Sequence, residues 1–181
     1  LSLAELAHAA RGGGGGGGGS GGFELGFLGG ISNTTQDYLN LAQSRANVSA
    51  GGISTPALTS AYELGMQAGW RFGGTIFAAL LRPTFFYQKA SGGNAAGDYN
   101  YGVTGFTVFP LLRLVPLEND FMHFYLQFGL GYGRTTTTVK ELDSELTAIG
   151  SAFGGQIGLG SEFCFVSAHC MIVEMNYRYL S

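Results

Sequence analysis

The sequence predicts an all-β protein, a small antiparallel up-and-down β-barrel that crosses a membrane. Only 12% of the 181 residues are Asp, Glu, Lys or Arg, about half the share found in an ordinary soluble domain. Apolar and polar residues alternate over long segments, as they do in strands with two different faces. No apolar run approaches the roughly 20 residues that a membrane helix needs. A chain of this kind can cross a bilayer only as a closed sheet that satisfies its own backbone groups.

The first 22 residues are predicted to form a separate unit, and the barrel is assigned to residues 23–181. Leu1–Ala10 has apolar residues at helical spacing and is predicted to be a short helix. Gly12–Gly19 is an unbroken glycine run that is typical of a flexible tether. The tethered helix could plug the barrel or dock on a partner. The favoured interpretation is a spacer without a role, and the sequence does not show whether the run is native.

Seven segments have the length and pattern of membrane strands. The clearest is Phe121–Tyr132, in which every even position is apolar, and Tyr62–Phe72 repeats the pattern. The other five are Phe23–Ile31, Thr75–Gln88, Tyr99–Phe109, Ala152–Phe165 and Cys170–Tyr179. Bacterial single-chain barrels have even strand numbers, so an eighth strand is expected. We expect it after Ser181, with Asn33–Ser60 or a partner chain as alternatives.

The connections between these strands alternate in length, as in outer-membrane barrels. The long ones are Ser32–Ala61, Lys89–Asp98 and Arg134–Gly150, and the shorter ones are Gly73-Gly74, Leu111–Asp120 and Val166–His169. The short side would face the periplasm and carry the N-terminus, and the long loops would be extracellular.

The apolar face of each strand is predicted to point outward. A small closed barrel has just enough interior for side chains, and rows of Phe, Leu, Met, Trp and Tyr would not fit inside it. Aromatic residues also gather near the strand ends, as expected for girdles at the two membrane interfaces. The predicted girdle residues are Tyr62, Trp70, Phe72, Tyr87, Tyr99, Tyr101, Phe109, Tyr132, Phe163, Tyr177 and Tyr179.

The opposite face carries most of the charged residues of the strands. These predicted lumen residues are Glu24, Glu63, Arg71, Arg82, His123, Glu162, Glu174 and Arg178. Charges in so narrow a space must pair to offset their desolvation. We therefore predict a salt-bridge network that plugs the barrel, with an ion path lined by the same residues as the alternative.

Cys164 and Cys170 flank the last short turn and are cross-strand partners if the pairing is centred on Ser167. In an exported protein this favours a disulfide near the periplasmic rim over two free thiols. No metal site is expected, because only His169 is nearby. Net charge is −3 and no basic stripe is present, which argues against nucleic acid. No catalytic triad or cofactor motif is apparent, so we predict neither an enzyme nor a bound cofactor.

The sequence resembles the OmpA-like family of eight-stranded outer-membrane barrels, which includes the opacity proteins. The resemblance is carried by the alternation of Phe124–Tyr132 and Val173–Tyr179. It implies a location in a Gram-negative outer membrane, in contact with the lipid bilayer and lipopolysaccharide. The chain departs from the family in lacking a final strand that ends in an aromatic residue. Pro83 is a second departure, where a bulge or a sheet edge is expected.

The predicted role is that of a structural or surface-interacting protein of the cell envelope, acting through its extracellular loops. One alternative is a subunit of a larger envelope assembly that docks through Leu1–Ala10, and another is a narrow channel for ions or small solutes.

Overall fold

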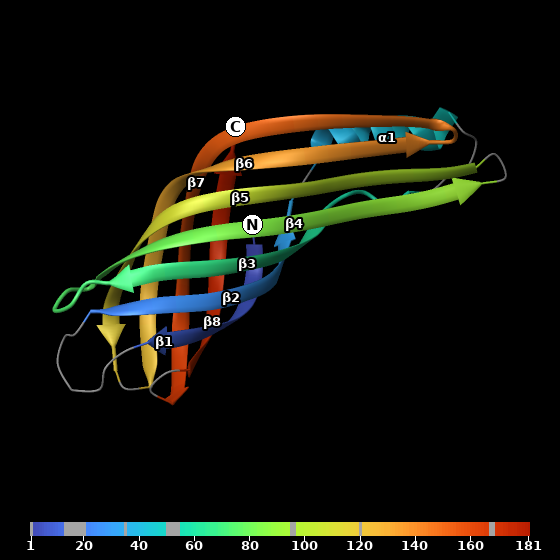
Figure 1. Ribbon diagram of the computed structural model, residues 1–181. Coiled ribbons are helices and arrows are strands. Elements are labelled where there is room, and N and C mark those ends of the chain that lie inside the picture. The colour runs from blue at the N-terminus through green and yellow to red at the C-terminus, as the bar shows by residue number, and fades with distance from the viewer. Residues whose placement is uncertain are drawn as a thin grey trace.

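Eight strands form a closed barrel in the computed structural model, which describes residues 2–12, 21–34, 36–49, 55–94, 97–119, 121–166 and 169–181. Each strand is antiparallel to its neighbours in chain order, and the last pairs with the first (Figure 1). The strands are β1 (Ser2–Gly12), β2 (Gly22–Asn33), β3 (Ser60–Arg71), β4 (Phe77–Asn94), β5 (Gly97–Glu118), β6 (Met122–Glu141), β7 (Ser144–Val166) and β8 (His169–Leu180). One helix, α1 (Asp37–Ser49), lies between β2 and β3.

The barrel is closed by β1, which the sequence had indicated as a helix. This prediction was wrong: residues 2–12 are extended and pair with both β2 and β8, with Ala7 opposite Leu28 and Ile172. An isolated ten-residue helix is marginal in water, whereas a strand placed here satisfies the backbone edges of two neighbours. The eighth strand therefore comes from the N-terminal segment, which belongs to the barrel and is not a separate unit.

The start of β1 lies at the rim opposite to the one expected. Ser2 pairs with Ser32 and Asn176, and Gly12 pairs with Phe23. The first strand thus runs toward the short turns, so its N-terminal end is on the side of the long hairpins. Residues 13–20 of the glycine run lie outside the described residues.

Two hairpins extend beyond the rest of the barrel (Figure 1). The β4–β5 pairing continues from Phe77 opposite Leu114 to Asn94 opposite Gly97, and the β6–β7 pairing continues to Glu141 opposite Ser144. Much of the predicted loops 89–98 and 134–150 is therefore regular sheet. The predicted turn at Leu111–Asp120 is also largely strand, because β5 continues to Glu118.

Helix α1 and residues 55–59 pack near the long hairpins, and together we call them the cap. Three amide side chains on one face of α1 bond to the backbone of the following segment. Asn40 donates to the Leu58 carbonyl at 3.2 Å and accepts from its N–H at 2.8 Å. Gln43 donates to the Pro56 carbonyl at 2.9 Å, and Asn47 accepts from the Thr55 N–H at 3.3 Å and from the Thr55 hydroxyl at 2.8 Å. This one described helix is not of the length and apolarity that would let a helix cross a membrane.

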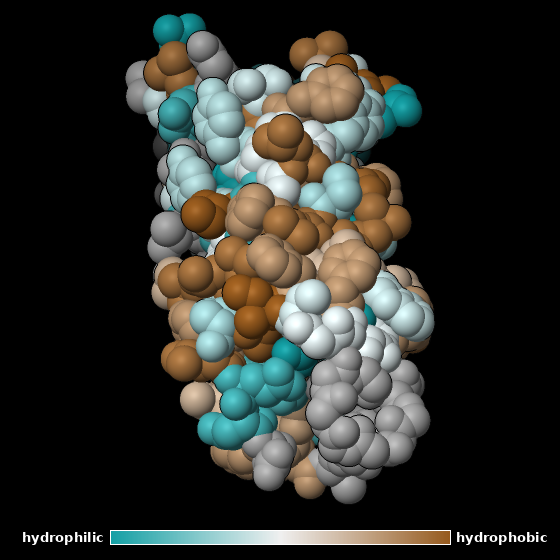
Figure 2. All heavy atoms as spheres, turned by 90° about the vertical axis from the view of Figure 1, so that its left-hand side faces the viewer, coloured by the Kyte–Doolittle hydropathy of each residue, from teal (hydrophilic) through white to brown (hydrophobic). Residues whose placement is uncertain are grey.

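The two faces of the wall differ as predicted. Along β3, Glu63, Gln67 and Arg71 are buried in the interior, whereas Tyr62, Leu64, Met66 and Trp70 are 44–69% exposed on the outside. In the face shown in Figure 2, hydrophobic side chains cover most of the middle of the molecule.

The expected bulge at Pro83 is absent. The register between β3 and β4 is the same on both sides of it, with Gly65 opposite Thr84 and Ala68 opposite Leu81. Pro83 also pairs with Val108 on β5, so it does not lie at an edge.

Candidate functional site

Inward-facing glycines make room for the large side chains of the lumen. Gly158 lies opposite Asn176, and a Cβ added to it would be 2.1 Å from the Asn176 Oδ1 atom. Gly160 lies opposite Tyr125, and its Cβ would be 2.5 Å from the Tyr125 hydroxyl. An eight-stranded barrel has little interior volume, so these glycines allow polar side chains to fill it.

The centre of the lumen is an ion pair between Arg82 on β4 and Glu174 on β8. Both side chains are fully buried, and Arg82 Nη2 is 3.0 Å from Glu174 Oε2. Glu174 also accepts hydrogen bonds from the Tyr125 hydroxyl at 2.6 Å, from Gln127 at 3.1 Å and from Asn176 at 2.7 Å. A buried pair is tolerated when its remaining hydrogen-bonding capacity is used in this way.

A second buried arginine, Arg113 on β5, connects this pair to the short-turn end. Its guanidinium lies 2.5 Å from Glu162 and 3.3 Å from Glu24, and stacks 3.9 Å from the centre of the Tyr125 ring. The Gln67 side-chain oxygen accepts from Arg82 at 2.7 Å and from Arg113 at 3.2 Å, so the two arginines share an acceptor.

Sequence reasoning missed Arg113 because the predicted turn at Leu111–Asp120 contained it. The signal was nevertheless present: the inward positions Phe109 and Leu111 are followed, at the same spacing of two, by Arg113 and Val115, all of them buried.

The network continues to both ends of the lumen. Toward the short turns, Arg71 donates to Glu118 at 2.8 Å, and His123 lies 3.4 Å from Glu118 and 3.5 Å from Glu162. Toward the long hairpins, Arg178 makes two 3.3 Å contacts with Glu63. The connecting amides, which the predicted set of charged lumen residues did not include, are Gln67, Gln127, Gln156 and Asn176.

All eight predicted lumen residues therefore face the interior. Seven take part in ion pairs with one another, with Arg113 or with Glu118, and His123 lies against the carboxylates of Glu118 and Glu162. The arrangement is a single polar core that runs through the barrel. Its groups are engaged with one another, which is what a structural plug requires.

Cys164 and Cys170 are cross-strand partners joined in a disulfide, with their Cα atoms 4.0 Å apart. The bond links β7 to β8 beside the short turn, and Cys164 Sγ is 4.0 Å from His123 Nδ1. Within the described part of the chain, no group of three or more His, Cys, Asp or Glu side chains is arranged to hold a metal ion.

Of the predicted girdle residues, eight face outward, and three residues of β5 do not, which makes the prediction wrong for those three. Tyr99, Tyr101 and Phe109 are at most 5% exposed and point into the barrel. They have the inward parity of their strand, which a prediction based only on nearness to the strand end does not consider. The outward-facing residues of the predicted set are Tyr62, Trp70, Phe72, Tyr87, Tyr132, Phe163, Tyr177 and Tyr179.

The two misassigned tyrosines form the interior beneath the long hairpins. Tyr99 and Tyr101 pack with Ala90 and with Leu58 of the cap, and Leu39 of α1 covers them. The Tyr101 hydroxyl donates to Glu141 at 2.7 Å. Burial, together with this carboxylate, raises the pKa of the Tyr101 phenol above its ordinary value.

No family model matches the chain, and comparisons with curated proteins and with solved structures give no match either. The class of protein is therefore defined by architecture alone: an eight-stranded antiparallel barrel with a charged interior and an apolar exterior.

Proposed function

We propose that this chain is an integral β-barrel protein of a bacterial outer membrane, of the OmpA-like kind, with a structural or surface-interacting role. The observation that carries the proposal is the inverted polarity of the barrel. Arg82, Arg113 and Glu174 are at most 3% exposed inside it, whereas Leu64, Leu130 and Phe153 are 68–77% exposed outside it.

The exposed apolar side chains favour lipid over water as the surrounding medium. Soluble monomers rarely expose a contiguous apolar patch larger than a few hundred Å². Here the outer faces of β3, β6 and β7 carry successive large apolar residues, and covering one such side chain stabilises it by about 1.5–3 kcal/mol. A bilayer would cover all of them at once.

The contacts inside the barrel favour a closed lumen and argue against an open channel. The two central arginines share acceptors with each other and bind carboxylates from β2, β7 and β8. An open pore would need water in place of these contacts. We therefore propose that interaction with other molecules occurs at the long hairpins and the cap, outside the bilayer.

Refolding tests the membrane part of this proposal. Chain unfolded in urea is diluted into lipid vesicles, into neutral detergent or into buffer alone. We expect heat-modifiable gel migration after the first two and aggregation in buffer. Trp70 is the single tryptophan and is 52% exposed on the outer face, so brominated lipid should quench its fluorescence. A stable monomer in buffer, with Trp70 open to aqueous quenchers, would contradict the proposal.

Planar-bilayer recording tests the closed lumen. The inserted protein should give no stable open current at neutral pH. Variant Glu174→Ala, which removes the carboxylate bound by Arg82, Tyr125, Gln127 and Asn176, should give intermittent currents. A steady conductance from the unaltered chain would favour the narrow channel instead.

A further inference from the structure

We propose that the outer wall carries a binding site for a lipid with a phosphate headgroup. Its acyl chain would lie in an apolar hollow across β5–β8, and its phosphate would bind Arg134 on β6. The inference rests on the proposed membrane function and adds to it one localised site on the wall.

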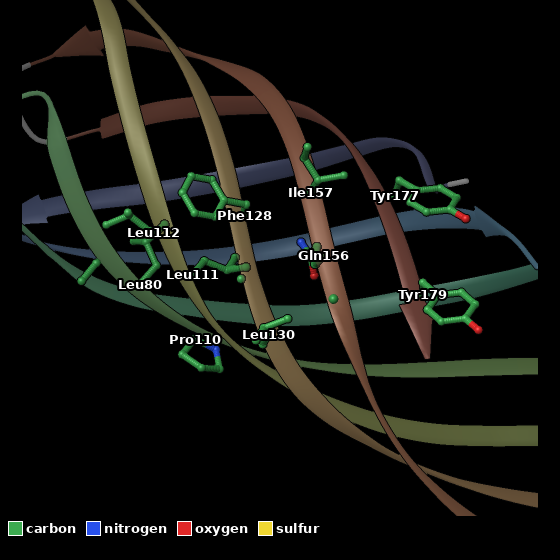
Figure 3. Close-up of a pocket in the computed structure, with 13 residues that line it drawn as sticks. Leu80, Pro110, Leu111, Leu112, Phe128, Leu130, Gln156, Ile157, Tyr177 and Tyr179 are labelled. Carbon is green, nitrogen blue, oxygen red and sulfur yellow. The ribbon is translucent and has the colours of Figure 1, made fainter. Parts of the chain in front are cut away.

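The hollow has two connected parts. The first, of about 830 Å³, lies between Leu112 and Phe128 on one side and Tyr177 and Tyr179 on the other (Figure 3). The second, of about 650 Å³, shares Pro110 and Leu130 with it. It reaches Tyr132 and Phe153, whose ring centres are 5.3 Å apart. The two parts together form an apolar path from the middle of the wall toward the long hairpins.

Gly155 keeps the first part of the hollow open. It is opposite Leu130 and Tyr179, both strongly exposed, so it belongs to the outer face. A Cβ added there would meet only the Gly129 carbonyl at 3.6 Å and the Leu130 side chain at 3.7 Å, which are ordinary contacts. Packing therefore does not require glycine at this position. Its effect is to leave space on the outside of the wall.

Arg134 follows the hollow at the end nearest the long hairpins. It is exposed and has the same outward parity on β6 as Phe128, Leu130 and Tyr132. Two strand residues span about 7 Å, so its Cα lies about that far beyond that of Tyr132. An arginine guanidinium binds phosphate through two parallel hydrogen bonds.

The positions of the cationic side chains favour this end of the wall as the place where a phosphate headgroup binds. Four of the arginines whose side chains are described (Arg71, Arg82, Arg113 and Arg178) lie in the lumen network. The other described cationic side chains, Arg45, Lys89, Arg134 and Lys140, lie in the cap or in the long hairpins. Along the wall, the apolar hollow is followed by Tyr132 and then by Arg134. This order matches the acyl chain, the interfacial region and the headgroup of an anionic lipid.

The test measures lipid retention by the folded barrel in neutral detergent, using native mass spectrometry. The probes are diphosphoryl lipid A, monophosphoryl lipid A and phosphatidylcholine. We expect the unaltered chain to prefer diphosphoryl lipid A over phosphatidylcholine by about tenfold, as one charge-assisted contact provides. Variant Arg134→Gln should lose this preference. Variant Gly155→Phe, which fills the hollow, should weaken the binding of all three lipids.

Two matched variants control for charge and bulk. Lys89→Gln removes an exposed cation from β4, and Leu64→Phe adds an outward ring on β3, away from the hollow. Both should bind lipid A as the unaltered chain does. Unchanged binding by Gly155→Phe would overturn the hollow as the site, and unchanged preference in Arg134→Gln would overturn the headgroup contact. Dimers that Gly155→Phe abolishes would show that a second copy occupies the face instead.

Folding is scored separately by heat-modifiable migration of each variant. A folded barrel without lipid preference would contradict only this site. Failure of the unaltered chain to enter vesicles would contradict the proposed membrane function itself.

Discussion

The interior of the barrel has two regions that are stabilised in different ways. The lumen, between the short turns and Glu63, is crossed by ion pairs and amides around Arg82 and Arg113, with two small apolar clusters beside them. The region beneath the long hairpins has an apolar cluster and no buried ion pair among the described residues, and there the cap residue Leu58 packs on Tyr99 and Tyr101. The two regions of one interior are thus packed by different kinds of contact.

The difference follows from which elements can surround each region. In the lumen, strands β2 to β8 contribute charged and amide groups, so each group can find several partners across a narrow space. The long hairpins have no complete ring of strands around them, because β8 ends opposite Gly154 and β3 begins at Ser60. Their inner face is covered by the cap, whose Leu39 and Leu58 pack against Tyr99 and Tyr101. We therefore expect damage to the lumen to affect the whole barrel and damage to the cap to stay local.

The largest effect is expected from Arg82→Ala. The substitution removes the cation from a fully buried pair and leaves the Glu174 charge in the lumen. Breaking a buried pair in this way costs about 3–5 kcal/mol. Urea unfolding of the barrel in detergent, followed by Trp70 fluorescence, should show a lower midpoint in a single transition.

Two further variants serve as comparisons for Arg82→Ala. Replacing both partners, Arg82→Met with Glu174→Leu, should recover part of the loss because no unpaired charge remains. Arg45→Ala, at an exposed position of α1, should change the free energy of unfolding by no more than about 0.5 kcal/mol. A midpoint unchanged by Arg82→Ala would show that the network does not stabilise the fold.

A smaller and local effect is expected from Leu58→Ala. Leu58 is 2% exposed and packs on Tyr99 and Tyr101, and truncating a buried leucine costs about 2–5 kcal/mol where it packs. Because the cap only covers the hairpins, we expect faster proteolysis and hydrogen exchange within residues 36–49 and 55–59, with little change in the unfolding midpoint. A fall in the midpoint as large as that of Arg82→Ala would mean that the two regions unfold as one unit.

The strand alternation was enough to predict most of the lumen. Once the apolar face of each strand is assigned to the outside, the period of two fixes which charges face inward. This placed Glu63, Arg82 and Glu174 inside without knowledge of their partners. The same rule paired Cys164 with Cys170, because a short turn determines the register of the strands that it joins.

The errors arose where local sequence and tertiary structure disagree. Leu1–Ala10 is rich in helix-favouring residues, but the open edges of β2 and β8 determine its conformation. In β5, Pro110 and Pro116 suggested a turn. Pro110 has no partner on β6, and the register shifts between Leu114 and Leu117, so each proline lies where the β5–β6 ladder is interrupted. These pairings between distant segments cannot be predicted from composition.

The smallest of the expected effects tests how tightly the lumen is packed. In Gly158→Ala, the new methyl group would be 2.1 Å from Asn176 Oδ1, which accepts hydrogen bonds from Gln127 and Gln156. Asn176 must move, so we expect a loss of about 1–2 kcal/mol in the free energy of unfolding.

Gly155→Ala is the matched control on the same strand, because its methyl group points outward into ordinary contacts. That control should be neutral or slightly stabilising, since glycine is unfavourable within a strand. Equal losses in both variants would mean that the glycines set backbone geometry, and that the lumen is not as tightly filled as its contacts indicate.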